Sequence, residues 1–393
     1  MCYICISRSL KLTMCVTQIS DELRPYFDSE IPQAVERMLA DPMMDPMITF
    51  GFGQNMISDI RLKLSGVRSA DQFQRVFVQP MLENIIARTS SGFSNNGADG
   101  IPAQCGHLFI SNHRDIVLDG ALLQLLLLHA GRPTSEITFG SNLISSQFVE
   151  DFGRSNKMYK ILRDGTGRDL VRNSILLSEH IHQVVARKDS IWISQRDGRT
   201  KNGHDKTDQG LIKMLTLGNR NNPVQAIAEL NIIPFAVSYE YESCDAMKAR
   251  EIYMRRRGAY VKAPGEDMRS IMQGITQFKG AIHIQLCEPL SAAELAALDS
   301  SEGNDMVRGV ASMIDNRIYR AYRLFATNYI AYDIKNTSNT YADFYDSDSR
   351  DRFDAYLHRQ AESVTDADTD EIYDILLDIY ANPVINKTLA DMQ

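Results

Sequence analysis

Short apolar runs alternate with longer amphipathic stretches through the middle of the chain. The clearest helical pattern covers residues 168–187, where apolar side chains fall close to one face and charged residues lie elsewhere. Strands separated by helices predict an α/β fold, a mixed, largely parallel sheet flanked by helices. The predicted strands cover residues 107–111, 136–139, 158–162, 190–194, 232–237 and 282–287.

The two ends of the chain have helical patterns without strong strands. Pro32 can stand in a first helical turn, and the polar stretch 90–97 is the clearest break in the sequence. We therefore expect three regions. They are a helical N-terminal region at 1–95, an α/β domain at 96–290 and a helical C-terminal region at 291–393, with helices at 306–330, 350–360 and 370–380.

Composition and charge exclude several classes of protein. The 393 residues are 44% hydrophobic and carry a net charge of -8, so no overall basic field is present to hold a nucleic acid. Three of the six cysteines crowd into the first fifteen residues, which is not a disulfide framework and fits a reducing cytosol. No apolar run is long enough to span a membrane, and residues 1–17 are interpreted as a poorly ordered leader, with Met14 as an alternative start. We expect no metal site, since the spacing of Cys2 and Cys5 has no matching second pair.

Residues 109–119 place a histidine where an apolar strand runs into a polar turn and then an apolar helix. His113 stands in this turn, and Asp115 and Asp119 follow closely. A carboxylate that holds one imidazole nitrogen fixes the tautomer and leaves the other nitrogen as a base. The pattern favours His113 as a general base; the alternative is a helix-entry residue bonded to local backbone.

Two further strand ends carry cations. Residues 158–163 end in Arg163, and residues 191–201 contain Arg196 and Arg199 around a glycine turn. Because parallel strands release their carboxyl ends on one side of a sheet, these groups could converge on a phosphate. The alternative is a loop of solvated charges, an interpretation that suits Lys201 better than Arg196. Pro234, within the strand 232–237, indicates an edge strand or an interrupted ladder.

In this order and spacing, the blocks resemble the glycerolipid acyltransferase family, which includes the 1-acylglycerol-3-phosphate acyltransferases. That family carries an Asn-His turn followed by Asp, a strand ending in Arg, a Glu-Gly-Thr-Arg phosphate-binding turn and a strand with proline. The resemblance covers residues 105–245, and the matching positions are Asn112-His113 with Asp119, 158–163, Asp197-Gly198-Arg199 and 232–237.

The sequence departs from the family at two points. The family's Asp stands five residues after His, where this chain has Leu118 between Asp115 and Asp119. The phosphate-binding turn has Asp for Glu, and its arginine comes one place early. Asp119 is the favoured partner of His113, because the small and apolar helix start that follows the family's aspartate follows Asp119 here. Asp115 is expected to cap that helix.

The resemblance implies transfer of a fatty acyl group from acyl-CoA or acyl carrier protein to the hydroxyl of 1-acylglycerol 3-phosphate, making phosphatidate for phospholipid biosynthesis. It implies no cofactor and a cytoplasmic protein held peripherally at the inner face of the membrane. Alternatives are glycerol 3-phosphate or an aminolipid as acceptor, or a non-catalytic lipid-binding protein. The acyl chain could lie along residues 121–128 or beside the apolar residues of 43–52. The implied substrate-binding residues are Asn112, Arg163, Arg196, Asp197, Gly198 and Arg199.

Overall fold

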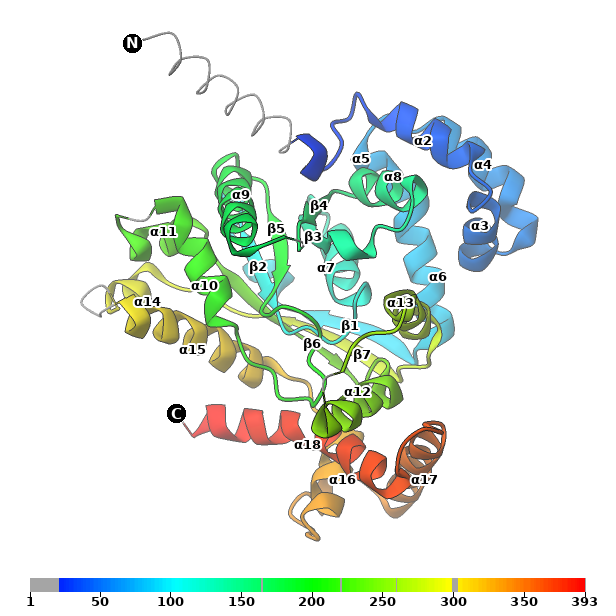
Figure 1. Cartoon of the computed structure of the whole chain (residues 1–393), viewed down its shortest axis with the longest axis vertical. Coiled ribbons are helices and arrows are strands. Elements are labelled where there is room, and N and C mark those ends of the chain that lie inside the picture. The colour runs from blue at the N-terminus through cyan, green and yellow to red at the C-terminus, as the bar shows by residue number, and fades with distance from the viewer. Residues whose placement is uncertain (1–20, 164, 220, 259, 299–302, 393) are drawn as a thin grey trace. The chain divides into compact units, whose positions relative to one another are not determined.

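The computed structural model describes residues 21–392 except 164, 220, 259 and 299–302, so the leader predicted at residues 1–17 lies outside the described residues. Seven strands of the described residues form one mixed, mostly parallel sheet in the order β1-β7-β6-β2-β5-β3-β4 (Figure 1). This confirms the predicted α/β fold and all six predicted strands. The strands are β1 (Gly92–Asn96), β2 (Leu108–Ser111), β3 (Glu136–Gly140), β4 (Met158–Ile161), β5 (Ile191–Ser194), β6 (Ile233–Tyr239) and β7 (Ala281–Leu286).

Two strands differ from the sequence-based expectation. β1 falls in the stretch predicted as a polar break, because its residues are polar, partly exposed and paired only along one side, with β7. β6 lies inside the sheet, parallel to β2 and antiparallel to β7, so the edge position suggested by Pro234 is wrong. The Pro234 carbonyl accepts a hydrogen bond from Cys287 N at 2.9 Å. The proline is tolerated because it lacks only a donor and still contributes its acceptor.

The chain forms two compact units, each assembled from segments that are not consecutive. The first holds the described residues up to Asn84 together with Thr134–Trp192, and the second holds Ile85–Pro133 and Ile193–Gln393. The predicted boundaries after residues 95 and 290 concern consecutive domains and stay a prediction.

Helices of the first unit pack around their own apolar core. In α2, Ile31, Val35 and Met38 recur at helical spacing and are buried. Met44 and Ile48 of α3 are buried in the same core, whereas Met43 is exposed, so a role of residues 43–52 beside an acyl chain stays a prediction. The helices are α2 (Ile31–Ala40), α3 (Met44–Phe52), α4 (Ile57–Ser65), α5 (Ala70–Phe73), α8 (Gln147–Ser155) and α9 (Gly167–Ala186), with the short 3₁₀ helices η1 (Gln54–Met56) and η4 (Ser141–Leu143) and the π-helix η2 (Gln74–Val78). Helix α6 (Gln79–Thr89) runs across the boundary between the units.

In the second unit, α7 (Leu118–His129) is buried on nearly every side. Its leucines are core residues, which corrects the suggestion that an acyl chain lies along residues 121–128. The other helices are α10 (Gln209–Leu215), α11 (Pro223–Glu229), α12 (Asp245–Arg257), α13 (Glu266–Thr276), α14 (Ala292–Ala296), α15 (Gly303–Ala321), α16 (Ala326–Lys335), α17 (Ser347–Glu362) and α18 (Thr369–Asp391), with the short 3₁₀ helices η3 (Ala98–Gly100), η5 (Thr216–Asn219) and η6 (Ala342–Phe344).

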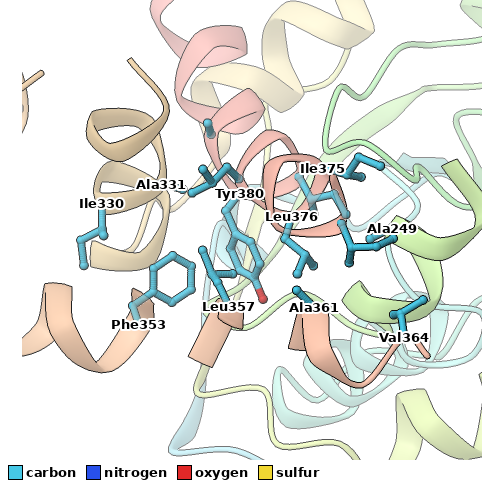
Figure 2. Close-up of a cluster of buried hydrophobic side chains, with 14 of the residues drawn as sticks. Ala249, Ile330, Ala331, Phe353, Leu357, Ala361, Val364, Ile375, Leu376 and Tyr380 are labelled. Atoms are coloured by element: carbon cyan, nitrogen blue, oxygen red, sulfur yellow. The ribbon is translucent and has the colours of Figure 1, made fainter. Parts of the chain in front are cut away.

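The C-terminal helices form a second apolar cluster together with α12. α18 packs against α12, α15, α16 and α17 (Figure 1). In Figure 2, Phe353 and Leu357 gather around Tyr380, and the rings of Phe353 and Tyr380 meet edge to face at 5.0 Å. The helix predicted at 306–330 is two helices, because Asn328 Oδ1 accepts a hydrogen bond from Phe325 N and starts α16 anew. None of the helices in the described part of the chain is long and apolar enough to cross a membrane.

Candidate active site

Asn112 extends the sheet beyond the end of β2. Its Oδ1 accepts a hydrogen bond from Val237 N at 2.8 Å, and its Nδ2 donates to Val237 O at 2.9 Å. The carboxamide takes the place of a peptide group beside β6, which lets the main chain leave the sheet and turn. Asn112 is fully buried with both polar atoms engaged, so it holds the turn, and its predicted role in binding substrate stays a prediction.

His113 lies in this turn and is held by Asp119. His113 Nδ1 is 3.0 Å from Asp119 Oδ2, and the same oxygen accepts hydrogen bonds from Arg114 N at 2.6 Å and Asp115 N at 2.9 Å. Asp119 Oδ1 accepts a hydrogen bond from Tyr239 OH at 2.9 Å. Asp119 is completely buried, whereas His113 keeps 9% of its surface exposed. A carboxylate only accepts, so Nδ1 carries the proton and Nε2 is the basic nitrogen of the neutral imidazole.

Asp115 holds the start of α7 instead. Its Oδ1 accepts hydrogen bonds from Val117 N at 2.9 Å and Leu118 N at 2.8 Å, and its Oδ2 accepts one from the Ser243 hydroxyl. Helix α13 approaches this carboxylate through Gly274, where a Cβ atom would lie 2.2 Å from Asp115 Oδ2. Of the two carboxylates in the turn, Asp119 thus bonds to the imidazole and Asp115 to the beginning of the helix.

A buried ion network lies beneath the turn. The Arg114 guanidinium pairs with Asp205 at 2.6 Å and with Glu242 at 3.1 Å, and Lys248 Nζ lies 2.6 Å from Glu242. Burial alone would lower the pKa of Arg114, but the charges of Asp205 and Glu242 raise it well above its usual value. Burial alone would likewise raise the pKa of Asp205, but Arg114 and the hydrogen-bond donors around it lower it. The positive charges of Arg114 and Lys248 equal in number the negative charges of Asp205 and Glu242. The network therefore holds the turn without adding net charge.

Tyrosines from the C-terminal part of the chain donate hydrogen bonds to two buried carboxylates at this end of the sheet. Asp205 accepts a hydrogen bond from the Tyr322 hydroxyl. Asp245, the first residue of α12, accepts hydrogen bonds from Tyr356 OH at 2.6 Å and Tyr380 OH at 2.8 Å. The C-terminal helices are therefore part of the support of the site.

The turn after β5 carries the predicted phosphate-binding residues and adjoins His113. Gly198 has a φ of +67°, which a glycine adopts without strain, and it reverses the chain between exposed Asp197 and buried Arg199. Thr200 N donates a hydrogen bond to His113 O at 2.8 Å. The turn is thereby tied directly to the histidine.

Arg199 is a buried cation without a carboxylate partner among the described residues. It is 7% exposed, its Nη1 has no hydrogen-bond partner, and it forms no ion pair with any residue that the structure describes. Lys201, by contrast, pairs with Glu251 at 2.7 Å, and its side chain is only 20% exposed, so the solvated position predicted for it is wrong. Burial, together with the neighbouring Arg199 charge, lowers the pKa of Lys201 to about 8. A buried, unpaired guanidinium is costly in the absence of an anion.

Arg196 and Arg163 differ from Arg199. Arg196 is half-buried in the same turn, whereas Arg163 is exposed and belongs to the first unit, near Gly140. The structure thus brings His113, Asp119 and the turn of Arg199 together within one unit. A joint clamp that includes Arg163 stays a prediction.

Tyr239, Asp205, Glu242 and Lys248 support the site and were not predicted by the sequence analysis. Asp205 and Lys248 lie in polar stretches with no motif spacing, and their partners are far away in sequence, so no local pattern marks them. Tyr239 ends a strand that was predicted, so its position at the carboxyl edge was the one available signal. Within the described residues, no three His, Cys, Asp or Glu side chains are grouped to hold a metal ion.

Comparison with known proteins shows similarity to a distant solved structure. No protein-family model matches the chain, and no curated protein matches it by sequence. Among solved structures, it resembles the crystal structure of the 1-acyl-sn-glycerophosphate (LPA) acyltransferase PlsC from Thermotoga maritima, with a TM-score of 0.38 and 11% sequence identity. The match covers 72% of this chain and 92% of that chain. A similarity this distant assigns neither activity nor substrate.

Proposed function

We propose that the protein is an acyltransferase in which His113 is the general base and Asp119 its charged partner. The carrying observation is the contact of 3.0 Å between His113 Nδ1 and the buried Asp119 carboxylate, at the carboxyl edge of a largely parallel sheet. Ligands of open α/β sheets usually bind at this edge. The order of sequence motifs shared with the glycerolipid acyltransferases supports a fatty acyl group as the cargo.

The reaction that this geometry supports is direct transfer. His113 Nε2 removes the proton from the acceptor hydroxyl as its oxygen forms a bond to the thioester carbonyl carbon. Asp119 stabilises the imidazolium that results. When the tetrahedral intermediate collapses, the carbon–sulfur bond breaks and the imidazolium returns its proton to the leaving thiolate. The products are an ester and a free thiol, and no covalent enzyme intermediate is required.

Arg199 is proposed to bind the phosphate of the acceptor. Its guanidinium is buried, has no carboxylate partner among the described residues and adjoins His113 through Thr200. A phosphate there would compensate the buried charge and orient the acceptor hydroxyl toward the imidazole. Arg196, Asp197 and Gly198 are proposed to shape the same turn.

The proposed donor is acyl-CoA or acyl carrier protein, and the proposed acceptor is 1-acylglycerol 3-phosphate. An acyl-transfer assay tests this, with each donor offered to lysophosphatidate, glycerol 3-phosphate and an aminolipid in turn. We expect phosphatidate from lysophosphatidate, and about a 10²- to 10⁴-fold loss of turnover in His113→Ala. His358→Ala is the matched control, because this histidine is exposed on α17. Equal turnover in wild type and His113→Ala would disprove the proposal.

We further propose that the protein acts at the inner face of the membrane as a peripheral protein, since the proposed acceptor and product are lipids. Flotation with vesicles of lysophosphatidate and phospholipid should recover the intact protein in the vesicle fraction, reversibly and in a salt-sensitive manner.

A further inference from the structure

Tyr239 lies one hydrogen bond beyond the pair of His113 and Asp119. Its hydroxyl donates to Asp119 Oδ1 at 2.9 Å, while His113 Nδ1 contacts Asp119 Oδ2 at 3.0 Å. The two contacts use opposite oxygens of one carboxylate. Phenol, carboxylate and imidazole therefore form a continuous chain of hydrogen bonds.

The sheet fixes the position of this phenol. Tyr239 is the last residue of β6 and pairs with Ile282 of β7, and two residues earlier Val237 is bound through both backbone groups by Asn112. Tyr239 is 5% exposed. Burial raises the pKa of Tyr239 well above its usual value, and the charge of Asp119 raises it further, so the phenol stays a donor at any pH at which the protein works.

We propose that Tyr239 is a positioning residue that sets the proton affinity of His113 through Asp119. A donor on Oδ1 withdraws negative charge from the carboxylate and weakens the support that Oδ2 gives to the imidazolium. The same bond keeps the carboxylate in one orientation. The proposal rests on the proposed function only in treating His113 as the base, because the hydrogen-bond chain exists without substrate.

Other charged groups surround the turn of His113, and they stay in place when the Tyr239 hydroxyl is removed. These groups belong to its own turn, to the turn after β5 and to the ion network beneath. They are Asp115 and Asp119, then Arg199, then Arg114, Asp205, Glu242 and Lys248.

The test is an NMR titration of the His113 imidazole in wild type and in Tyr239→Phe, with the His113 resonance identified by its absence from His113→Asn. We expect the titration midpoint to rise by about half a pH unit to one pH unit in Tyr239→Phe. Tyr241→Phe is the matched control. Tyr241 lies just beyond β6 and its hydroxyl makes no contact with Asp119. The His113 titration midpoint in Tyr241→Phe should therefore equal that in wild type. Turnover of Tyr239→Phe should fall by about tenfold, with the acid limb of its pH profile moved in the same direction.

A double variant separates this route from others. In Asp119→Asn, adding Tyr239→Phe should leave the His113 midpoint where the single Asp119→Asn variant puts it. An unchanged midpoint in Tyr239→Phe, or a shift that persists in the Asp119→Asn background, would overturn the proposal. A loss of turnover with lower thermal stability but no change of midpoint would mean a structural role and would also overturn it.

The wild-type protein provides a second measurement if Tyr239→Phe does not fold. With tyrosine labelled at Cζ with carbon-13, one resonance should change at the midpoint of His113 and lose this change in Asp119→Asn. Absence of such a resonance would contradict the coupling. If the coupling is present and the wild type transfers no acyl group, the proposed function fails while the assignment of Tyr239 stands.

Discussion

The carboxamide of Asn112 binds both backbone groups of Val237, at 2.8 Å and 2.9 Å, as a neighbouring strand would. A side chain thus continues the sheet for one position after the main chain has left it. The histidine that follows is placed at the rim of the sheet by its neighbour's amide.

Replacing Asn112 by Ala leaves the buried N–H and C=O of Val237 without partners. We expect the free energy of unfolding to fall by about 2 to 4 kcal/mol, since each buried unsatisfied group costs about 1 to 3 kcal/mol. Urea denaturation measures this loss. If Asn112 contacted substrate instead, Asn112→Ala would raise KM with stability unchanged, and that result would refute the positioning role.

Asp119→Asn and Asp115→Asn should separate catalysis from capping. An amide at 119 can still accept from the two backbone N–H groups and donate to the Tyr239 oxygen, so the variant should fold, but it cannot stabilise the imidazolium. Turnover should fall about 10²- to 10⁴-fold. Asp115→Asn should keep most of its turnover and lose about 0.5 to 2 kcal/mol of stability. The melting temperature and turnover of both variants test these two roles. An inactive Asp115→Asn beside an active but less stable Asp119→Asn would exchange the roles.

Arg199→Met should make the protein more stable and less active. The side chain keeps its apolar length but removes a buried charge that has no carboxylate partner among the described residues, so we expect a gain of about 1 to 3 kcal/mol. Inorganic phosphate should raise the melting temperature of wild type and not that of Arg199→Met. Arg196→Met is the control, because Arg196 is the half-buried arginine of the same turn. This substitution should change the melting temperature little. A destabilised Arg199→Met that still responds to phosphate would place the anion elsewhere.

We expect the stability of the protein to depend on pH through Asp315, which lies outside the candidate site. Burial raises its pKa to about 6, while hydrogen bonds from Thr207 N and Oγ1 act in the opposite direction. Between about pH 4 and pH 6 the unfolded chain has lost this proton and the folded chain keeps it, so folding takes up a proton and stability falls as pH rises.

Asp315→Asn keeps the acceptor for Thr207 and carries no charge. Its free energy of unfolding should match that of wild type below pH 4 and exceed it by about 2 to 3 kcal/mol above pH 6. Urea denaturation of both proteins at pH 4, 5, 6 and 7 measures the difference. A difference that does not change with pH would contradict the raised pKa.

More of the fold than of the candidate site could be predicted from the sequence. Apolar runs predicted six strands, because the side chains of these strands are buried. β1 is a polar edge strand and has no such run. The turn of His113 and its two carboxylates were found because they are close in sequence. Their separate roles depend on a turn geometry that spacing alone does not fix.

The groups that support the turn come from distant parts of the chain, and no local pattern connects them. Arg114 pairs with Glu242 across 128 positions, and Tyr239 reaches Asp119 across 120. Lys201 was expected in solvent because its neighbours are polar, but helix α12 covers it through Glu251. Such burial is a property of packing between elements.

The tyrosines that donate to Asp205 and Asp245 have a consequence for synthesis on the ribosome. Tyr322 lies 117 positions after Asp205, and Tyr380 lies 135 positions after Asp245. At about 5 to 20 residues per second, translation takes about 7 to 27 s to cover the longer interval. Strands β2, β5 and β6 have been synthesised by then, whereas Asp205 still lacks the Tyr322 hydroxyl and Asp245 the Tyr380 hydroxyl during these intervals. The nascent chain must keep this end of the sheet hydrated, and the dry site forms only after α18 is made.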